Sequence, residues 1–181
     1  MAMLTAVSVV LMYVSRANFP WIPLPFLEYD AADIPVLIGA IMLGPVQGLI
    51  ILFAVCLIQA ITVSAHSGWI GFIMHFFASA VLILIPSILY RKKKSIKSLI
   101  VGLILGVLGM TVVMVPLNLV FMGLYTGIQE GTDLKESVGR VVASLVPAII
   151  PFNLSKGAIN AAVTFAVFTP LSPVLKKYTK I

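Results

Sequence analysis

Long apolar runs alternate with short polar segments along the whole chain, and this alternation is its strongest pattern. A helix needs about 20 mostly apolar residues to cross the hydrocarbon core of a bilayer. The runs predict six helices, two of them short for a full crossing, at residues 2–15, 31–43, 45–64, 69–90, 98–125 and 145–170.

Glycine, proline and charged residues mark the ends of these runs. Gly44-Pro45 separates the second helix from the third, because proline cannot continue a helix. Pro116 predicts a kink inside the fifth helix. We expect a loop at residues 16–30, a short turn at 65–68 and a polar loop at 126–144.

Composition places the chain in the membrane. It is 61% hydrophobic and 10% charged, with a mean hydropathy of +1.15. Soluble domains average about 45–50% apolar and about 25% charged residues. Backbone polar groups must be satisfied inside a bilayer, which favours helices. We therefore predict an all-α integral membrane protein that forms one transmembrane domain over residues 1–181.

The basic residues predict how the chain is oriented. They cluster at residues 91–97 and in the tail at Lys176, Lys177 and Lys180. Such clusters lie on the cytoplasmic side of a membrane. Two predicted helices separate the two clusters, so both clusters can lie on the same, cytoplasmic side of the membrane. Counting back through the four earlier helices places the N-terminus on that side too, so both termini are predicted to be cytoplasmic. The loops 16–30 and 126–144 then face outward. Membrane topology explains the net charge of +6, so we expect no nucleic-acid partner.

An acidic segment follows the first helix. Residues 28–33 contain three of the six acidic residues of the chain, directly after a segment rich in proline and aromatic residues. It is either a plain connecting loop or a lid over a site, and the polar residues elsewhere favour the lid. Asp33 is predicted to cap the second helix, since acidic residues favour helix N-termini.

Several polar residues fall within the predicted spans, where they are costly and therefore functional candidates. Asn153, Lys156, Gly157 and Asn160 have the spacing i, i+3, i+4, i+7 and share one helical face. Asn118, Asn153 and Lys156 are predicted in the outer thirds of their helices. Amide and ammonium groups can bind a planar heterocycle edged with carbonyls and ring nitrogens.

Each candidate also has a structural alternative. Lys156 could extend outward to the interface, while Asn118 and Asn160 could hold helices together. The sequence favours packed or hydrogen-bonded roles for Gln59 and His75. Small residues at helix-packing spacing suggest close contacts within the protein, and these are Gly102 with Gly106, and Ala158 with Ala162 and Ala166.

The sequence gives little support for an enzyme. It contains no phosphate-binding loop of the Gly-rich Lys-Ser/Thr type and no Gly-x-Ser-x-Gly motif. Two distant histidines and one cysteine do not make a usual zinc site. We expect no catalytic residues, no metal and no cofactor.

The chain resembles the riboflavin-specific substrate-binding subunits, or S-components, of energy-coupling factor (ECF) transporters. The resemblance covers nearly the whole chain and is most specific at two stretches, Phe26-Leu27-Glu28-Tyr29-Asp30 and Pro151-Phe152-Asn153-Leu154-Ser155-Lys156-Gly157. Weaker matches are Asp33-Ile34-Pro35, Leu43-Gly44-Pro45-Val46-Gln47-Gly48 and Ser67-Gly68-Trp69-Ile70-Gly71. The positions Gln59-Ala60 and His75 depart from the family pattern, which affects the contacts expected for the ribityl chain.

The resemblance implies a six-helix S-component fold in the bacterial plasma membrane that binds riboflavin near the outer surface. It implies substrate contacts by Leu27, Tyr29, Asp30, Asn118, Asn153 and Lys156. It also implies a transmembrane coupling protein that contacts Ala2 and Ala6, and two cytoplasmic ATPases. Alternatives are an S-component for another vitamin or for FMN, or a small structural membrane protein.

Overall fold

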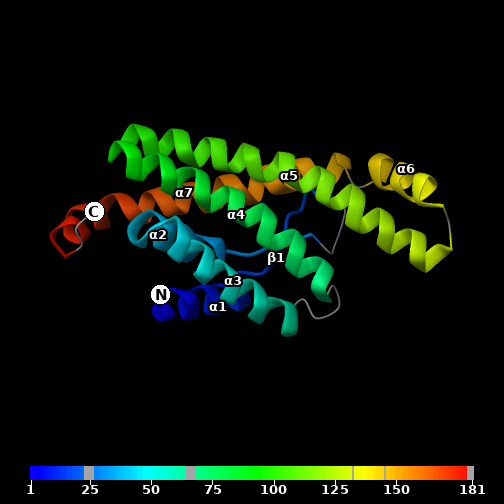
Figure 1. Cartoon of the computed structure of the whole chain (residues 1–181), viewed down its shortest axis with the longest axis horizontal. Coiled ribbons are helices and arrows are strands. Elements are labelled where there is room, and N and C mark those ends of the chain that lie inside the picture. Colours follow the sequence, from blue (N-terminus) through cyan, green and yellow to red (C-terminus); the bar gives the residue numbers. More distant parts are fainter. Residues whose placement is uncertain (23–26, 64–67, 132, 145, 179–181) are drawn as a thin grey trace.

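Helices that run along one long axis form most of the molecule in the computed structural model (Figure 1). The structure describes residues 1–22, 27–63, 68–131, 133–144 and 146–178, with only the backbone for 124–130, 134, 140, 141, 144 and 173–178. The elements in chain order are α1 (Ala2–Val14), β1 (Ala17–Asn18), β2 (Glu28–Tyr29), α2 (Asp33–Leu43), α3 (Pro45–Ile61), α4 (Gly68–Lys93), α5 (Ile96–Glu130), α6 (Leu134–Ser144) and α7 (Val146–Tyr178).

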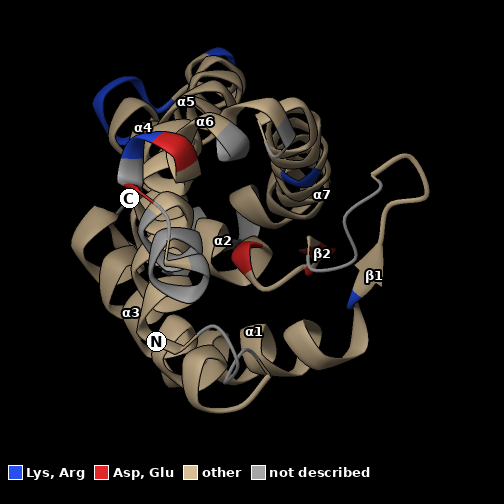
Figure 2. Ribbon diagram, turned by 90° about the vertical axis from the view of Figure 1, so that its right-hand side faces the viewer, with Lys and Arg blue, Asp and Glu red and all other residues tan. Residues whose placement is uncertain are grey.

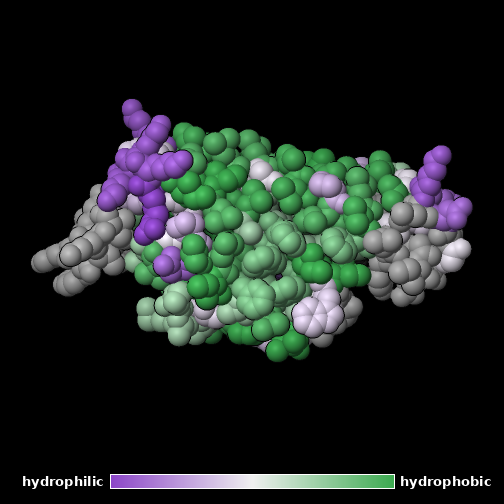
Figure 3. Space-filling model, viewed as in Figure 1, coloured by the Kyte–Doolittle hydropathy of each residue, from purple (hydrophilic) through white to green (hydrophobic). Residues whose placement is uncertain are grey.

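The apolar helices agree closely with the six predicted runs. Three helices in the described part of the chain are long and apolar enough to cross a membrane, within α4, α5 and α7, and three shorter apolar helices are α1, α2 and α3. The surface in Figure 3 is mostly hydrophobic along the middle of the molecule and hydrophilic towards both ends. This distribution is the one that a bilayer requires of its proteins.

The junction of α2 and α3 lies at Gly44-Pro45, as the sequence predicts. Gly44 has a φ of 131°, a conformation that favours glycine, and Pro45 is the first residue of α3. The two helices then pack closely, because a Cβ atom added at Gly48 would lie 2.4 Å from the Cβ of Ala40.

Small residues also let α4 and α5 approach each other. A Cβ on Gly102 would lie 2.6 Å from the Cα of Pro86, and one on Gly106 would lie 2.8 Å from the Leu82 carbonyl oxygen. The predicted packing of Gly102 and Gly106 is therefore confirmed. The corresponding prediction for Ala158, Ala162 and Ala166 is wrong, since all three are exposed. The helix α7 instead buries the face that carries Asn153, Lys156, Asn160 and Thr164.

The predicted polar loop at residues 126–144 is largely helical. The helix α5 continues to Glu130, and α6 occupies Leu134–Ser144. Gly123 lies where α5 meets α6, since a Cβ added there would lie 2.8 Å from a methyl group of Val138. The helix α7 likewise extends past the predicted end at residue 170, while most of the turn predicted at 65–68 lies outside the described residues.

Different elements lie at the two ends of the molecule. The N-terminus, the turn between α4 and α5 and the C-terminal end of α7 lie at the left in Figure 1, whereas α6 lies at the right. Figure 2 views the molecule from the α6 end, and it shows α1, α4, α5 and α7 around the region where β2 and the start of α2 lie. The candidate site is in that region.

Candidate functional site: a cavity beneath residues 16–30

A cavity of about 660 Å³ lies between the helices and the segment that joins α1 to α2. Small-molecule sites are typically about 300–1,000 Å³, mostly apolar, with a few placed polar groups. The lining residues come from α1, α3, α4, α5, α7 and the β2 region, and they include Met12, Leu27, Tyr29, Asp30, Gln59, Phe72, His75, Met110, Met114, Phe152, Asn153 and Lys156. The cavity therefore has the size and chemistry of a small-molecule binding site.

Arg16 and residues 27–30, from the two ends of the segment that joins α1 to α2, form one wall of this cavity. The two ends of this segment pair as antiparallel strands, with Ala17 opposite Tyr29 and Asn18 opposite Glu28. Arg16 and Glu28 form an ion pair beside this ribbon. Pairing the two ends satisfies backbone groups of residues 17–18 and 28–29.

Aromatic side chains fix the segment to α7. The Phe19 ring centroid lies 5.5 Å from that of Tyr29 and 5.8 Å from that of Phe152 on α7. Phe19, Ile22, Ala148 and Phe152 form a buried cluster, against which Leu27 packs. Residues 23–26, which include the predicted motif residue Phe26, lie outside the described residues.

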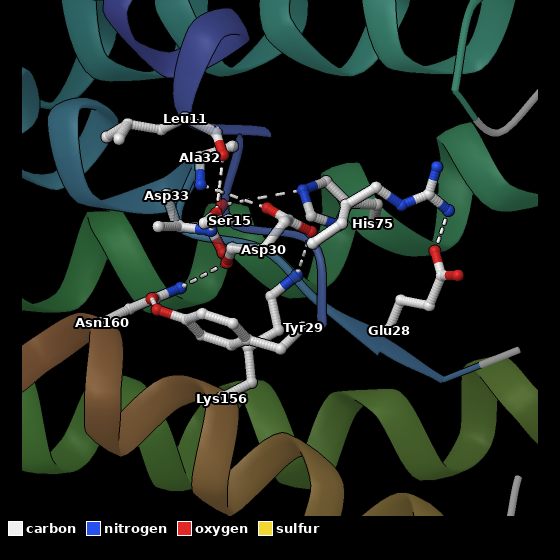
Figure 4. Close-up of polar contacts among 12 residues, drawn as sticks. Leu11, Ser15, Glu28, Tyr29, Asp30, Ala32, Asp33, His75, Lys156 and Asn160 are labelled. Carbon is white, nitrogen blue, oxygen red and sulfur yellow. Dashed lines mark hydrogen bonds and ion pairs between the residues drawn. The ribbon is translucent and has the colours of Figure 1, made fainter. Parts of the chain in front are cut away.

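An ion pair between Asp30 and Lys156 joins the segment to α7 in the interior (Figure 4). The Lys156 Nζ atom lies 2.8 Å from Asp30 Oδ2, and both side chains are less than 10% exposed. The other Asp30 oxygen, Oδ1, accepts a hydrogen bond of 3.1 Å from the Ala32 backbone N–H. Lys156 therefore points into the protein and does not extend to the interface.

A second contact between the same elements involves Tyr29 and Asn160. The Tyr29 hydroxyl donates to Asn160 Oδ1 at 3.0 Å, and Asn160 Nδ2 lies 3.5 Å from the Asp30 carbonyl oxygen (Figure 4). Burial raises the pKa of Tyr29 above its usual value of 10.0, so the hydroxyl keeps its proton and remains a donor. Asn160 thus joins the segment to α7.

Of the two asparagines predicted to contact the substrate, only Asn153 is among the described residues that line the cavity. Asn153 lines the cavity, and its Nδ2 donates to the Ile149 carbonyl oxygen at 2.8 Å. Asn118 is buried but is not among the described lining residues, and its Nδ2 donates to the Met114 carbonyl oxygen at 2.8 Å. The structure therefore brings Leu27, Tyr29, Asp30, Asn153 and Lys156 to one cavity and places Asn118 one helical turn from the lining residue Met114.

The opposite wall contains two polar residues that the sequence favoured as packing residues. Gln59 of α3 and His75 of α4 both line the cavity. Gln59 Oε1 and His75 Nε2 are buried and have no hydrogen-bond partner within the described structure. Two sequence signals point to these positions: their polarity inside apolar spans, and the departure from the family pattern at Gln59-Ala60 and His75.

Asp33 lies behind that wall. Its Oδ1 is 3.6 Å from His75 Nε2, and its side chain is 1% exposed. The predicted capping role is wrong, because Asp33 is the first residue of α2 and no side-chain hydrogen bond caps the helix. Its carboxylate instead faces the imidazole of His75 across the α2–α4 contact.

Comparison with known proteins agrees with this architecture. Residues 1–168 match the family model described as "ECF transporter, substrate-specific component". The chain is 31% identical to "Riboflavin transporter FmnP" of Bacillus subtilis (strain 168), over 97% of this chain and 92% of that protein. It is 32% identical to "Riboflavin transporter RibU" of Staphylococcus aureus (strain TCH60), over 97% of this chain and 90% of that protein.

A solved structure has the same fold over nearly its full length. It is described as "Structure and mechanism of the S component of a bacterial ECF transporter", with a TM-score of 0.75 and 31% sequence identity. The match covers 97% of this chain and 94% of the other. The chain belongs to the family of substrate-specific components of ECF transporters.

Proposed function

We propose that this chain binds riboflavin in the cavity beneath residues 16–30 and is the capture subunit of an ECF-type uptake transporter. One observation carries the proposal: a mostly apolar cavity of about 660 Å³ has a buried polar corner formed by Asp30, Asn153 and Lys156. Relatives that match almost the whole chain are named riboflavin transporters, which supports the choice of ligand.

The cavity offers complementary surfaces to a flavin. The faces of the tricyclic ring would pack against Leu27, Tyr29 and Phe152, which line one side. Asn153 and Lys156 would bind the polar edge of the ring, with Asp30 holding the Lys156 ammonium in place. Asn118 would act indirectly, by fixing the turn of α5 that presents Met114.

Such a site can support tight binding. Nanomolar affinity corresponds to about −12 kcal/mol. A ligand that fills a pre-formed cavity avoids much of the cost of ordering the protein. The contacts of Asp30 with Lys156 and of Tyr29 with Asn160 would hold the polar corner in one arrangement, which reduces the ordering that binding requires.

We further propose that the chain forms a single domain with six membrane spans and both termini in the cytoplasm. The basic residues 91–97 lie at the same end of the molecule as both termini (Figure 1). Clusters of this kind favour the cytoplasmic side. The segment 16–30 and its cavity would then face the outside, where it would act as a gate for the vitamin.

Transport by this chain would require partners. We propose a transmembrane coupling protein and two cytoplasmic ATPases, as the family membership suggests. The helix α1 offers a surface for the coupling protein, since Ala2 and Ala6 are exposed beside Met3, Val7 and Val10. These small and apolar side chains would let another helix approach closely.

Titration of riboflavin fluorescence with detergent-purified protein tests the ligand. We expect saturable quenching at nanomolar concentrations, and Asn153→Ala should raise the Kd about tenfold or more because a buried polar contact is lost. The matched control is Asn118→Ala, which removes a buried amide outside the cavity and should change the Kd less. Folded, ligand-free protein that shows no quenching would contradict the proposal and direct the search to other vitamins.

A further inference from the structure

We propose that a groove between α5 and α7 binds one anionic phospholipid, with an acyl chain in the groove and the headgroup phosphate at the basic turn between α4 and α5. The evidence is an apolar groove that begins one helical turn from Lys97 and its neighbouring lysines. The groove is separate from the cavity beneath residues 16–30, so the inference does not depend on the ligand proposed for that cavity.

The groove has a volume of about 440 Å³, and every described residue that lines it is apolar. Small side chains on α7 face larger ones on α5, and both alanines among them are exposed and leave a recess beside the branched side chains. The lining includes Ile100, Ile104 and Leu108 on α5 and Ala158, Ala162 and Phe165 on α7.

The length of the groove suits one acyl chain. Its α5 wall extends from Ile100 to Leu108, which corresponds to about 12 Å at a rise of about 1.5 Å per residue. One leaflet of a bilayer has a hydrocarbon depth of about 15 Å, half of the whole core. A chain that enters the groove at Ile100 would therefore follow it through most of one leaflet.

A lysine cluster, formed by Lys92, Lys93, Lys94 and Lys97, lies where the groove begins. Lys97 precedes Ile104 by seven residues, so both lie on the same face of α5. All four lysines are exposed. Figure 3 shows hydrophilic side chains at the left end, where the α4–α5 turn lies in Figure 1, beside hydrophobic surface. Lysine side chains can run along apolar surface and keep their ammonium groups at the interface.

The positive charge of the lysine cluster is not compensated within the described structure. All six acidic residues of the chain lie at 28–33 and 130–136, and none of the described ion pairs involves the cluster. Arg91 is different, because it donates to the Leu43 carbonyl oxygen at 3.2 Å. Lysine clusters at a membrane surface attract anionic lipids. A headgroup phosphate would supply the missing negative charge.

A lipid fits this groove better than a protein helix does. Small residues also let helices approach each other, but an apolar helix in the groove would leave the lysine cluster without a counter-charge. The α1 surface proposed for the coupling protein lies on the opposite side of the bundle from α5 (Figure 2). An anionic phospholipid would satisfy both the apolar groove and the charges at its end.

Native mass spectrometry of delipidated protein in detergent tests the headgroup. Wild-type protein is titrated with phosphatidylglycerol, which is anionic, and with phosphatidylethanolamine of the same acyl chains, which is zwitterionic. We expect the first phosphatidylglycerol to bind at least about fivefold more tightly. Lys97→Gln should weaken phosphatidylglycerol binding by about fivefold and leave phosphatidylethanolamine binding nearly unchanged. Lys135→Gln is the matched control, because it removes an exposed lysine on α6 and should change neither.

A second substitution tests the groove. Ala162→Leu places a larger side chain in the recess and should weaken the binding of both lipids by about threefold or more, since the acyl chain loses contacts. Ala143→Leu makes the same change at an exposed position on α6 and should have no effect. The substituted positions are all exposed, so we expect each lipid-free variant to unfold near the wild-type temperature.

Several outcomes would overturn the inference. Equal affinities of wild-type protein for the two lipids would remove the headgroup site, and this comparison requires no variant to fold. Unchanged phosphatidylglycerol binding in Lys97→Gln or in Ala162→Leu would place the lipid elsewhere. A wild-type dimer that Ala162→Leu dissociates would show that a second copy of the chain occupies the groove instead.

Discussion

The contact between Asp30 and Lys156 joins residues that are 126 positions apart in the chain. Taking two charges out of water is costly, and a buried ion pair is weak evidence for stability by itself. The ion pair instead acts through its position. It fixes Asp30 to α7 and orients the Lys156 ammonium at the cavity wall.

Removing one member of this pair should destabilise the protein more than removing both. Lys156→Met leaves the Asp30 carboxylate buried without its cation, which should cost about 3–5 kcal/mol of unfolding free energy. The double variant Asp30→Asn with Lys156→Met should recover much of that loss. Thermal unfolding of ligand-free protein in detergent measures both effects. A double variant that is no more stable than Lys156→Met would show that the ion pair is not the cause.

The sequence could predict the polar residues of the site but not their partners. Lys156 and Asn153 stand out because they interrupt an apolar run on one helical face. Nothing local to the sequence brings Asp30 to Lys156 or Asp33 to His75, since both contacts depend on how distant helices pack. Asp33 has the position expected of a capping residue, but its partner lies on α4.

At the scale of elements, apolar runs predicted the helices α1 to α5 and α7 well. The region 126–144 is predicted as a loop because it contains many charged residues. That prediction ignores the spacing of the apolar residues among them. Val138 and Val142 lie four residues apart among polar residues, which is the pattern of a helix with one apolar face. Of the two valines, Val138 packs against α5, as its close approach to Gly123 shows, whereas Val142 is exposed.

The contact between α2 and α3 leads to a prediction about Gly48. An added Cβ would lie 2.4 Å from the Cβ and 2.9 Å from the Cα of Ala40, and backbone must move to relieve the second contact. We expect Gly48→Ala to cost about 1–3 kcal/mol of unfolding free energy.

A matched substitution on α6 controls for the helix propensity of alanine. Gly139→Ala adds the same methyl group where no atom from elsewhere in the described structure lies within 4 Å, so it should be neutral or stabilise by up to about 1 kcal/mol. Thermal unfolding compares the two variants. Equal effects would mean that α2 and α3 can separate at little cost.

At the scale of the molecule, an apolar middle and hydrophilic ends define a multi-pass protein of the bacterial plasma membrane (Figure 3). The cavity is lined by the first half of α4 and by residues between 110 and 122 of α5, and therefore lies away from the basic turn that joins these two helices. Orientation therefore decides which compartment supplies the ligand, and the basic residues predict that it is the outside.

Single cysteines on either side of α5 test this orientation. The one native cysteine, Cys56, is buried and can be replaced by alanine to give a background without thiols. In that background, a membrane-impermeant maleimide should label Lys135→Cys in intact cells and Lys93→Cys only after permeabilisation, since both positions are exposed and α5 separates them. The reverse pattern would place the cavity in the cytoplasm, which contradicts capture from outside. Labelling of both positions in intact cells would instead show that α5 does not cross the membrane, and the six-span arrangement would fail.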